Sequence, residues 1–128
     1  MTGPLYRLLA DNLPARGGKV ALIDAGRQVT YDQLHAEAGR LAAWLTGRGL
    51  RPGDRVVVHL RKGIDEVAAM FAAWRLGAVV VNVNAQWSAG QLAYVAGDCR
   101  AAAAILPPGP AAGLAGRAAI LTRGPGTP

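Results

Sequence analysis

The sequence has few of the residues from which disulfides, metal centres and membrane spans are built. Cys99 is the single cysteine, so no intramolecular disulfide can form, and no CxxC or Cys/His cluster predicts a zinc site. Polar residues or glycine interrupt every apolar run before the ~18 residues that a membrane span needs. The segment from Met1 to Asn12 lacks a basic region followed by an apolar one, which argues against a signal peptide. We therefore expect a protein of the reducing cytoplasm without a membrane span.

Lysine and the aromatic residues are also scarce, although the chain as a whole is basic. The net charge is +6 and the pI is about 10.5, values that would suit a nucleic acid or an anionic membrane surface. The arginines, however, are spread from Arg7 to Arg123, and no aromatic side chains interleave with them as a stacking platform requires. We expect no nucleic-acid partner, and a basic surface-binding protein is the least favoured interpretation.

Apolar residues are abundant, and alanine makes up much of them. They form 52% of the 128 residues, which is enough for one domain with a thin core. From Pro107 the composition changes to proline, glycine and alanine, which suit neither a helix nor a central strand. We therefore predict a folded segment over residues 1–106 and a disordered tail over residues 107–128.

The N-terminal part of the sequence predicts a helix, a hairpin and a second helix. Leucines at helical spacing predict an amphipathic helix over residues 4–13. Extended segments on either side of Ala25-Gly26 predict a β-hairpin. Thr30 and Gln33 have the spacing of a capping box, in which the threonine hydroxyl accepts from the third helical amide. A long helix should therefore start there and end at Gly49, a glycine suited to a left-handed C-terminal position.

The middle of the sequence predicts a strand, a helix and a second strand. Pro52-Gly53 fits a type II turn and precedes the apolar run Val56-Val57-Val58, which is typical of a strand buried on both faces. An amphipathic helix from Ile64 to Gly77 leads to a second buried strand over residues 78–83. Short links in such a unit predict that the two strands are parallel, with a right-handed connection.

A third helix and a third strand complete the predicted fold. Ser88 and Gln91 repeat the capping-box spacing and predict a helix that ends at Gly97. Residues 101–106 predict a third strand. The expected fold class is α/β, with a partial, mainly parallel sheet flanked by helices and preceded by the hairpin.

No combination of side chains predicts catalysis. His35 lies on the polar side of a predicted helix and His59 within a predicted strand, and neither has the carboxylate and nucleophile of a triad nearby, so packing or surface roles are favoured. Cys99 lacks a paired base, which favours a buried or half-buried thiol. Asp65 and Glu66 adjoin a helix start, where carboxylates favour the helix dipole. We accordingly predict no catalytic, cofactor-binding or metal-binding residue.

Several short motifs nevertheless occur in one order. They are Thr30-Tyr31-x-x-Leu34, Gly49-Leu50-x-x-Gly53-Asp54-Arg55-Val56, Gly77-Ala78-Val79, Leu92-x-Tyr94 and Asp98-Cys99. Together they resemble the beginning of the AMP-forming acyl-CoA synthetase and ligase family, also called adenylate-forming enzymes. The resemblance covers residues 5–106, and the Asn82-Val83-Asn84 stretch departs from the more usual Pro-Leu-Asn or Pro-Val-Asn of that family.

The resemblance implies a piece of a larger adenylate-forming domain. The parent enzyme would use ATP and magnesium to convert a carboxylate to an acyl-adenylate and would then pass the acyl group to coenzyme A. In that family the phosphate loop, the magnesium-binding acid, the ribose-binding aspartate and the C-terminal lysine all follow the matched segment. No position of this chain matches them, so no cofactor is expected for the chain alone.

The tail holds one candidate for part of that machinery. Leu121-Thr122-Arg123-Gly124-Pro125-Gly126-Thr127-Pro128 is faintly similar to a strand that runs into the family's phosphate loop. A phosphate cradle uses successive backbone N–H donors and usually a lysine. Pro125 and Pro128 remove two donors and no lysine follows, so a flexible or out-of-frame terminus is the favoured interpretation.

The favoured function is a truncated or split N-terminal piece of such a ligase, not catalytic alone. The alternative is a non-catalytic interaction module that pairs with a full-length ligase. The expected partner is therefore a C-terminal ligase portion or a full-length ligase.

Overall fold

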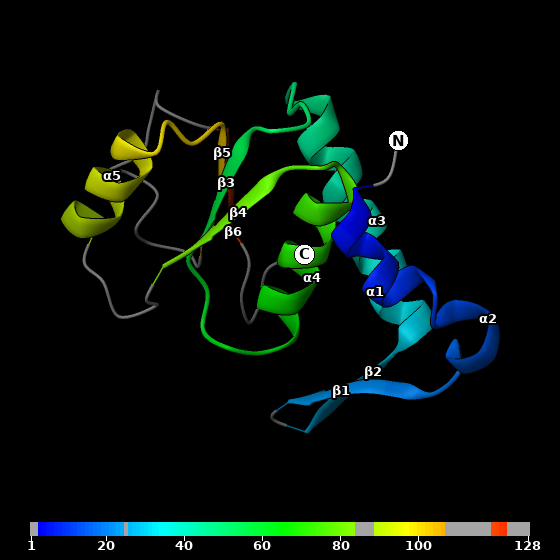
Figure 1. Ribbon diagram of the computed structural model, residues 1–128. Coiled ribbons are helices and arrows are strands. Elements are labelled where there is room, and N and C mark those ends of the chain that lie inside the picture. Colours follow the sequence, from blue (N-terminus) through cyan, green and yellow to red (C-terminus); the bar gives the residue numbers. More distant parts are fainter. Residues whose placement is uncertain (1–2, 25, 84–88, 107–118, 123–128) are drawn as a thin grey trace.

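A four-stranded parallel sheet, covered by helices on both faces, forms the body of the protein (Figure 1). The computed structural model describes residues 3–24, 26–83, 89–106 and 119–122. The strand order is β4-β3-β5-β6, and each neighbouring pair is parallel. This arrangement confirms the predicted α/β class with a mainly parallel sheet. The strands are β3 (Arg55–Val58), β4 (Val79–Asn82), β5 (Ala103–Leu106) and β6 (Ala119–Thr122).

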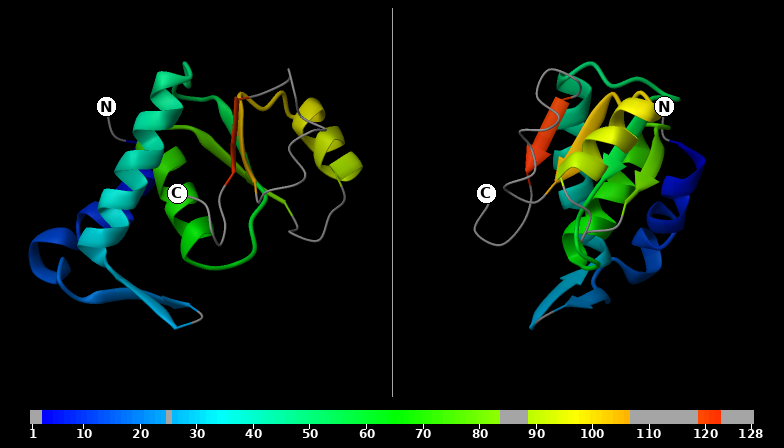
Figure 2. Two further views of the ribbon diagram at one scale, coloured as in Figure 1. Left: turned by 180° about the vertical axis from the view of Figure 1, so that it is seen from behind. Right: turned by 90° about the vertical axis from the view of Figure 1, so that its left-hand side faces the viewer.

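The two faces of the sheet bury separate sets of side chains. Successive strand residues point to opposite faces. Val56 and Val58 therefore pack with helices α3 (Tyr31–Gly47) and α4 (Ile64–Arg75), whereas Val57 packs with Leu92 of α5 (Ala89–Asp98). Figure 2 shows α5 on the opposite side of the sheet from α3 and α4. Burial on both faces explains the unbroken apolar run in the central strand β3.

Local signals specify both ends of α3 as predicted. Gln33 N–H donates to Thr30 Oγ1 at 3.1 Å, and Thr30 N–H donates to Gln33 Oε1 at 2.8 Å, which completes the capping box. At the other end Gly49 has φ +87°, and Leu50 N–H donates to the Leu45 carbonyl at 3.1 Å. This Schellman motif satisfies carbonyls that the last helical turn leaves unpaired.

The next turn and the end of α4 repeat this use of glycine. Gly53 has φ +86°, and Asp54 N–H donates to the Arg51 carbonyl at 3.0 Å, as the predicted type II turn requires. Gly77 has φ +73° at the end of α4, and the chain continues directly into β4. The parallel pairing of β3 with β4 confirms the predicted strand-helix-strand unit.

The predicted helix over residues 4–13 is wrong as a single element. The segment instead forms η1 (Pro4–Tyr6), α1 (Arg7–Ala10) and, after a turn, α2 (Leu13–Arg16). Asn12 Nδ2 donates to the Leu8 carbonyl at 2.8 Å, and the ring of Pro14 would clash with a carbonyl one turn earlier if α1 continued.

The buried face of this segment also differs from the predicted leucine stripe. Tyr6 and Leu9 are buried, whereas Leu5 and Leu8 remain 49% and 63% exposed. The Tyr6 hydroxyl lies 2.6 Å from Nδ1 of His35, so the segment is held against α3 through an aromatic side chain.

The predicted hairpin is present as β1 (Val20–Asp24) and β2 (Arg27–Thr30), paired antiparallel. It projects away from the parallel sheet beyond the start of α3 (Figures 1 and 2). The inner side of the hairpin contacts the body at α3 and at the start of α4.

Several predicted features differ from the structure or lie outside its described part. His59 follows β3 instead of lying within it, and the third strand starts at Ala103 instead of Ala101. Residues 119–122 form β6 inside the segment expected to lack regular structure. The rest of that tail, and Ser88 of the second capping box, lie outside the described residues, so the domain boundary at 106 stays a prediction.

Candidate functional site

The carboxyl ends of β3 and β5 are the place where this sheet would hold a ligand. Taken in chain order, the four parallel strands occupy the spatial order 2-1-3-4, because β4 lies outside β3 and the chain then crosses to β5. In doubly wound sheets of this order, ligands bind outside the carboxyl ends, at the point where the connections diverge to opposite faces. Here that point lies between β3, which leads into α4, and β5, which follows α5.

His59 lies at this point. Its backbone N–H donates to the Ile105 carbonyl at 2.9 Å, which extends the pairing of β3 with β5 by one residue. The residue is 2% exposed, and its Nδ1 has no hydrogen-bond partner within the part of the chain that the structure describes. Burial lowers the pKa of the imidazole, because the charged form loses its hydration. His59 is thus a neutral, buried ring at the carboxyl end of the central strand, and it is not a surface histidine.

The other candidate residues from the sequence lie in positions that agree with structural roles. His35 bonds with Tyr6, as described above, which agrees with a packing role. Cys99 is half-buried and packs against the core on the α5 side. Asp65 and Glu66 lie in the first turn of α4, where carboxylates favour the helix dipole. The fold brings none of these groups together with His59 in a described contact.

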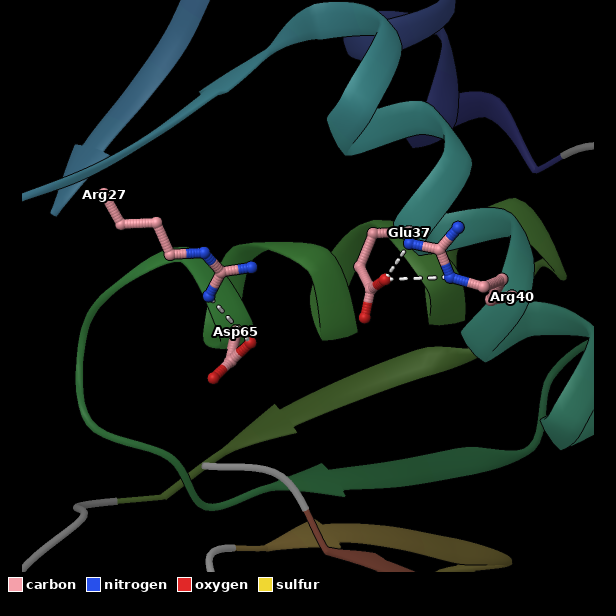
Figure 3. Close-up of polar contacts among 4 residues, drawn as sticks. All are labelled: Arg27, Glu37, Arg40 and Asp65. Carbon is pink, nitrogen blue, oxygen red and sulfur yellow. Dashed lines mark hydrogen bonds and ion pairs between the residues drawn. The ribbon is translucent and has the colours of Figure 1, made fainter. Parts of the chain in front are cut away.

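A second feature, which the sequence did not indicate, is a polar hollow between the hairpin, α3 and the start of α4. Its volume is about 290 Å³. Arg27 lies 3.7 Å from Asp65, and Arg40 Nε donates to Glu37 Oε2 at 3.0 Å (Figure 3). The lining residues are Arg27, Gln28, Val29, Gln33, Leu34, Glu37, Arg40 and Ile64.

The carboxylates at this hollow are paired with arginines. The carboxylates are the less exposed partners, at 15% for Glu37 and 26% for Asp65, and each faces an arginine that is more than half exposed. The i, i+3 spacing of Glu37 and Arg40 indicates an ion pair within one helix, so this pair could have been read from the sequence. The pair of Arg27 and Asp65 could not, because the two residues lie far apart in the chain.

The described residues offer neither a metal cluster nor a membrane-spanning helix. No group of three or more His, Cys, Asp or Glu side chains among them could hold a metal ion. No helix in the described part of the chain has the length and apolar character needed to cross a membrane.

Of the candidate phosphate loop, the structure describes only the strand that leads into it, β6. β6 pairs with β5 in parallel, with Leu106 opposite Thr122, so its carboxyl end lies at the same edge of the sheet as His59. The residues after Thr122 lie outside the described part of the chain.

Three known proteins illustrate what the chain is similar to. The 3-oxocholest-4-en-26-oate–CoA ligase of Rhodococcus rhodochrous is 41% identical over 85 residues, which is 66% of this chain and 15% of that ligase. The structure of apo MatB from Rhodopseudomonas palustris matches with a TM-score of 0.84 at 30% identity. The match covers 98% of this chain and 26% of the MatB chain. The anthranilate CoA ligase AuaEII in complex with anthranoyl-AMP has a TM-score of 0.78 at 30% identity, over 84% of this chain and 21% of its own.

These likenesses all involve a small part of a larger protein. The chain spans about 15% of the length of the curated relative and about a quarter of the solved structures named above. Residues 9–123 match the family model described as AMP-binding enzyme. Since this match takes in nearly the whole chain, from the N-terminal helices to β6, the protein belongs to the AMP-binding, adenylate-forming enzyme family.

Proposed function

We propose that this chain is a truncated or split N-terminal piece of an AMP-forming acyl-CoA ligase. The parent enzyme would activate a carboxylic acid as its acyl-adenylate and transfer the acyl group to coenzyme A. One observation carries the proposal: 98% of the chain superposes on a solved family member, yet it accounts for only 26% of that protein. The proposal also has the support of two relatives that are named as CoA ligases, one of them solved with an acyl-AMP.

The proposal assigns ATP, magnesium and coenzyme A to the parent enzyme and not to this chain alone. Among the described residues, the carboxyl edge offers His59 and backbone groups but no cluster of carboxylates for magnesium. His59 is neutral and buried, so it suits a hydrogen bond to a group placed at that edge better than binding of an anion. We accordingly propose that catalysis requires a C-terminal ligase portion, and that the chain works in the cytoplasm, where its single thiol stays reduced.

The assignment of ranges follows from this function. We propose that the N-terminal segment of the adenylate-forming domain, expected from the sequence over residues 1–106, also takes in β6 within the tail. The family match to residue 123 and the strand β6 both support a continuation of the domain into residues 119–122.

Two assays of ATP–pyrophosphate exchange test the proposal. The purified chain should show no exchange with any carboxylate, because the groups that bind magnesium and phosphates in the family have no counterpart here. A chimera in which residues of this chain replace the aligned 85-residue segment of the Rhodococcus ligase should exchange with that ligase's own substrate. Exchange by the chain alone would contradict the fragment proposal, and a folded but inactive chimera would contradict its origin in a ligase.

A further inference from the structure

The N-terminal segment of residues 3–10 is joined to the body of the protein through one aromatic side chain. η1 and α1 run beside α3 and α4 (Figure 1), and Tyr6 is 2% exposed between them. Its ring packs edge-on to Phe71 of α4, with 6.0 Å between the ring centroids, and the Arg75 guanidinium lies 5.4 Å from its centroid. Its hydroxyl lies 2.6 Å from Nδ1 of His35 on α3. Tyr6 therefore holds the segment to both helices.

The hydrogen bond between Tyr6 and His35 requires a neutral imidazole. A neutral ring with its proton on Nε2 accepts the hydroxyl proton at Nδ1, whereas a protonated ring carries an N–H group at each nitrogen and accepts nothing. The hydroxyl oxygen can then accept from the ring instead. The hydroxyl proton, however, makes no bond to a second acceptor among the described residues. Leaving that buried donor without a partner costs free energy, so a charge on His35 weakens the contact.

A permanent cation lies close to the same contact. The Arg75 guanidinium lies over the Tyr6 ring, and its Nη1 is 3.1 Å from the place of a Cβ on Gly39, one helical turn after His35 on α3. A charged His35 and Arg75 would thus meet the same aromatic ring and the same stretch of α3. Because like charges repel at short range, a positive charge on His35 opposes the docked position of the segment a second time.

His35 is the group of this contact that changes charge in mild acid. Burial raises the pKa of the Tyr6 hydroxyl, and the Arg75 guanidinium only partly offsets this, so the phenol keeps its proton. An imidazole ordinarily changes charge between pH 5 and 8. The other charged groups on the surrounding helices are directed elsewhere: Arg7 pairs with Asp11, Arg16 bonds to Asn12, Asp32 lies against Gly17, Glu37 pairs with Arg40, and Asp65 and Glu66 lie at the far end of α4 from Arg75.

We propose that the contact between Tyr6 and His35 is a proton-operated latch. Neutral His35 holds residues 3–10 against α3 and α4, and protonation of His35 releases them while the parallel sheet stays folded. Release exposes Tyr6 and Leu9 and uncovers Phe71. Terminal segments open at a lower free energy than the core of a protein, so this opening needs no global unfolding. The latch is a property of this chain that does not depend on the proposed function.

Hydrogen–deuterium exchange of the whole chain, read by mass spectrometry at pH 7.5 and pH 5.5, tests the latch. After correction for the intrinsic pH dependence of exchange, protection of residues 3–10 should fall at least about fivefold at pH 5.5. One proton linked to opening changes that equilibrium by up to about tenfold per pH unit. Protection of residues 55–58 in β3 should fall less.

Two histidine variants assign the effect. His35→Gln supplies an amide oxygen that accepts from the Tyr6 hydroxyl and does not titrate, so protection of residues 3–10 should become nearly independent of pH. His59→Leu is the matched control, because it removes the other histidine of the chain, and it should keep the pH dependence of wild type in this segment. Tyr6→Phe keeps the ring contacts and removes the donor. It should lower protection at pH 7.5 and reduce the further change at pH 5.5.

Three outcomes would overturn the latch. The first is the same pH dependence of residues 3–10 in His35→Gln as in wild type. The second is an equal loss of protection in residues 3–10 and in β3 at pH 5.5, since the chain would then open as a whole. The third applies even where His35→Gln does not fold: a wild-type exchange profile in Tyr6→Phe at both pH values would show that the hydroxyl does not hold the segment.

Discussion

His59 is the residue whose environment differs most from what its chemistry prefers. A buried imidazole with an unpaired nitrogen costs free energy, because water would otherwise bond to that nitrogen. Its backbone bond to the Ile105 carbonyl holds it in place. Unsatisfied buried groups of this kind occur at sites that complete their bonding with a ligand or a partner.

The burial of His59 should make the protein less stable in mild acid. Its pKa is lowered in the folded state, so below about pH 6.5 the unfolded chain binds a proton that the folded chain does not. The free energy of unfolding should therefore fall as the pH falls from 7 toward 5, by up to about 1.4 kcal/mol per pH unit from this residue. Urea unfolding of wild type and His59→Leu at both pH values checks this. Equal pH dependence in the two proteins would show that His59 is not responsible.

Thr30 is the residue that starts α3. Replacing it with alanine removes the acceptor of the Gln33 amide and should cost about 1 kcal/mol of unfolding free energy. Thr46→Ala, an exposed threonine within the same helix, should change the urea midpoint little. If the two variants were equally destabilised, the cap would not be the cause.

At the scale of the elements, the N-terminal segment is held by a close backbone contact between Gly3 and the end of α4. Gly3 N–H donates to the Arg75 carbonyl at 3.0 Å, and a Cβ on Gly3 would lie 2.1 Å from the carbonyl oxygen of Trp74. Tyr6 then packs edge-on to Phe71 and under the Arg75 guanidinium. The glycine is therefore required by close approach to α4.

Gly3→Ala should detach or displace η1 and α1. Overpacking against backbone costs about 1–3 kcal/mol, and Gly18→Ala is the control because nothing lies within 4 Å of a Cβ at that position. Thermal unfolding followed by circular dichroism should show a lower midpoint for Gly3→Ala and a nearly unchanged one for Gly18→Ala. An unchanged midpoint in both would mean that the segment is not tightly docked.

On the scale of the whole molecule, several arginines among the described residues are engaged in contacts within the protein. Arg7, Arg27 and Arg40 each face a carboxylate, and Arg48 and Arg75 lie over the rings of Trp44 and Tyr6. Arginines that are engaged within the protein release few counterions from a nucleic acid.

The whole protein should therefore bind duplex DNA only weakly. At physiological salt, fluorescence anisotropy with a labelled 20-base-pair duplex should show no saturable binding below about 100 µM protein. Micromolar binding that weakens steeply with added salt would instead support a basic surface-binding protein.

Much of the fold was predictable because its signals are local. The capping box, the glycines with positive φ and the apolar runs each specify one element within a few residues. Pro14 was a readable signal for a break in this segment, which the leucine spacing alone does not indicate. The candidate site was less predictable, since His59 reads as one more strand residue until its neighbours are known.

The amino-acid sequence by itself determined most of the elements from β1 to β5, their order and the family, because helix caps, turns and strand runs depend on residues close together in the chain. Only the tertiary structure decided which strands are neighbours, that His59 is buried beside β5, and that Arg27 meets Asp65. It also decided that Val20 and Ile23 face solvent, since the bulge at Ala21 depends on the pairing of β1 with β2. These features arise from pairing between distant residues, whose energy comes from packing and burial in three dimensions and leaves no mark on local sequence.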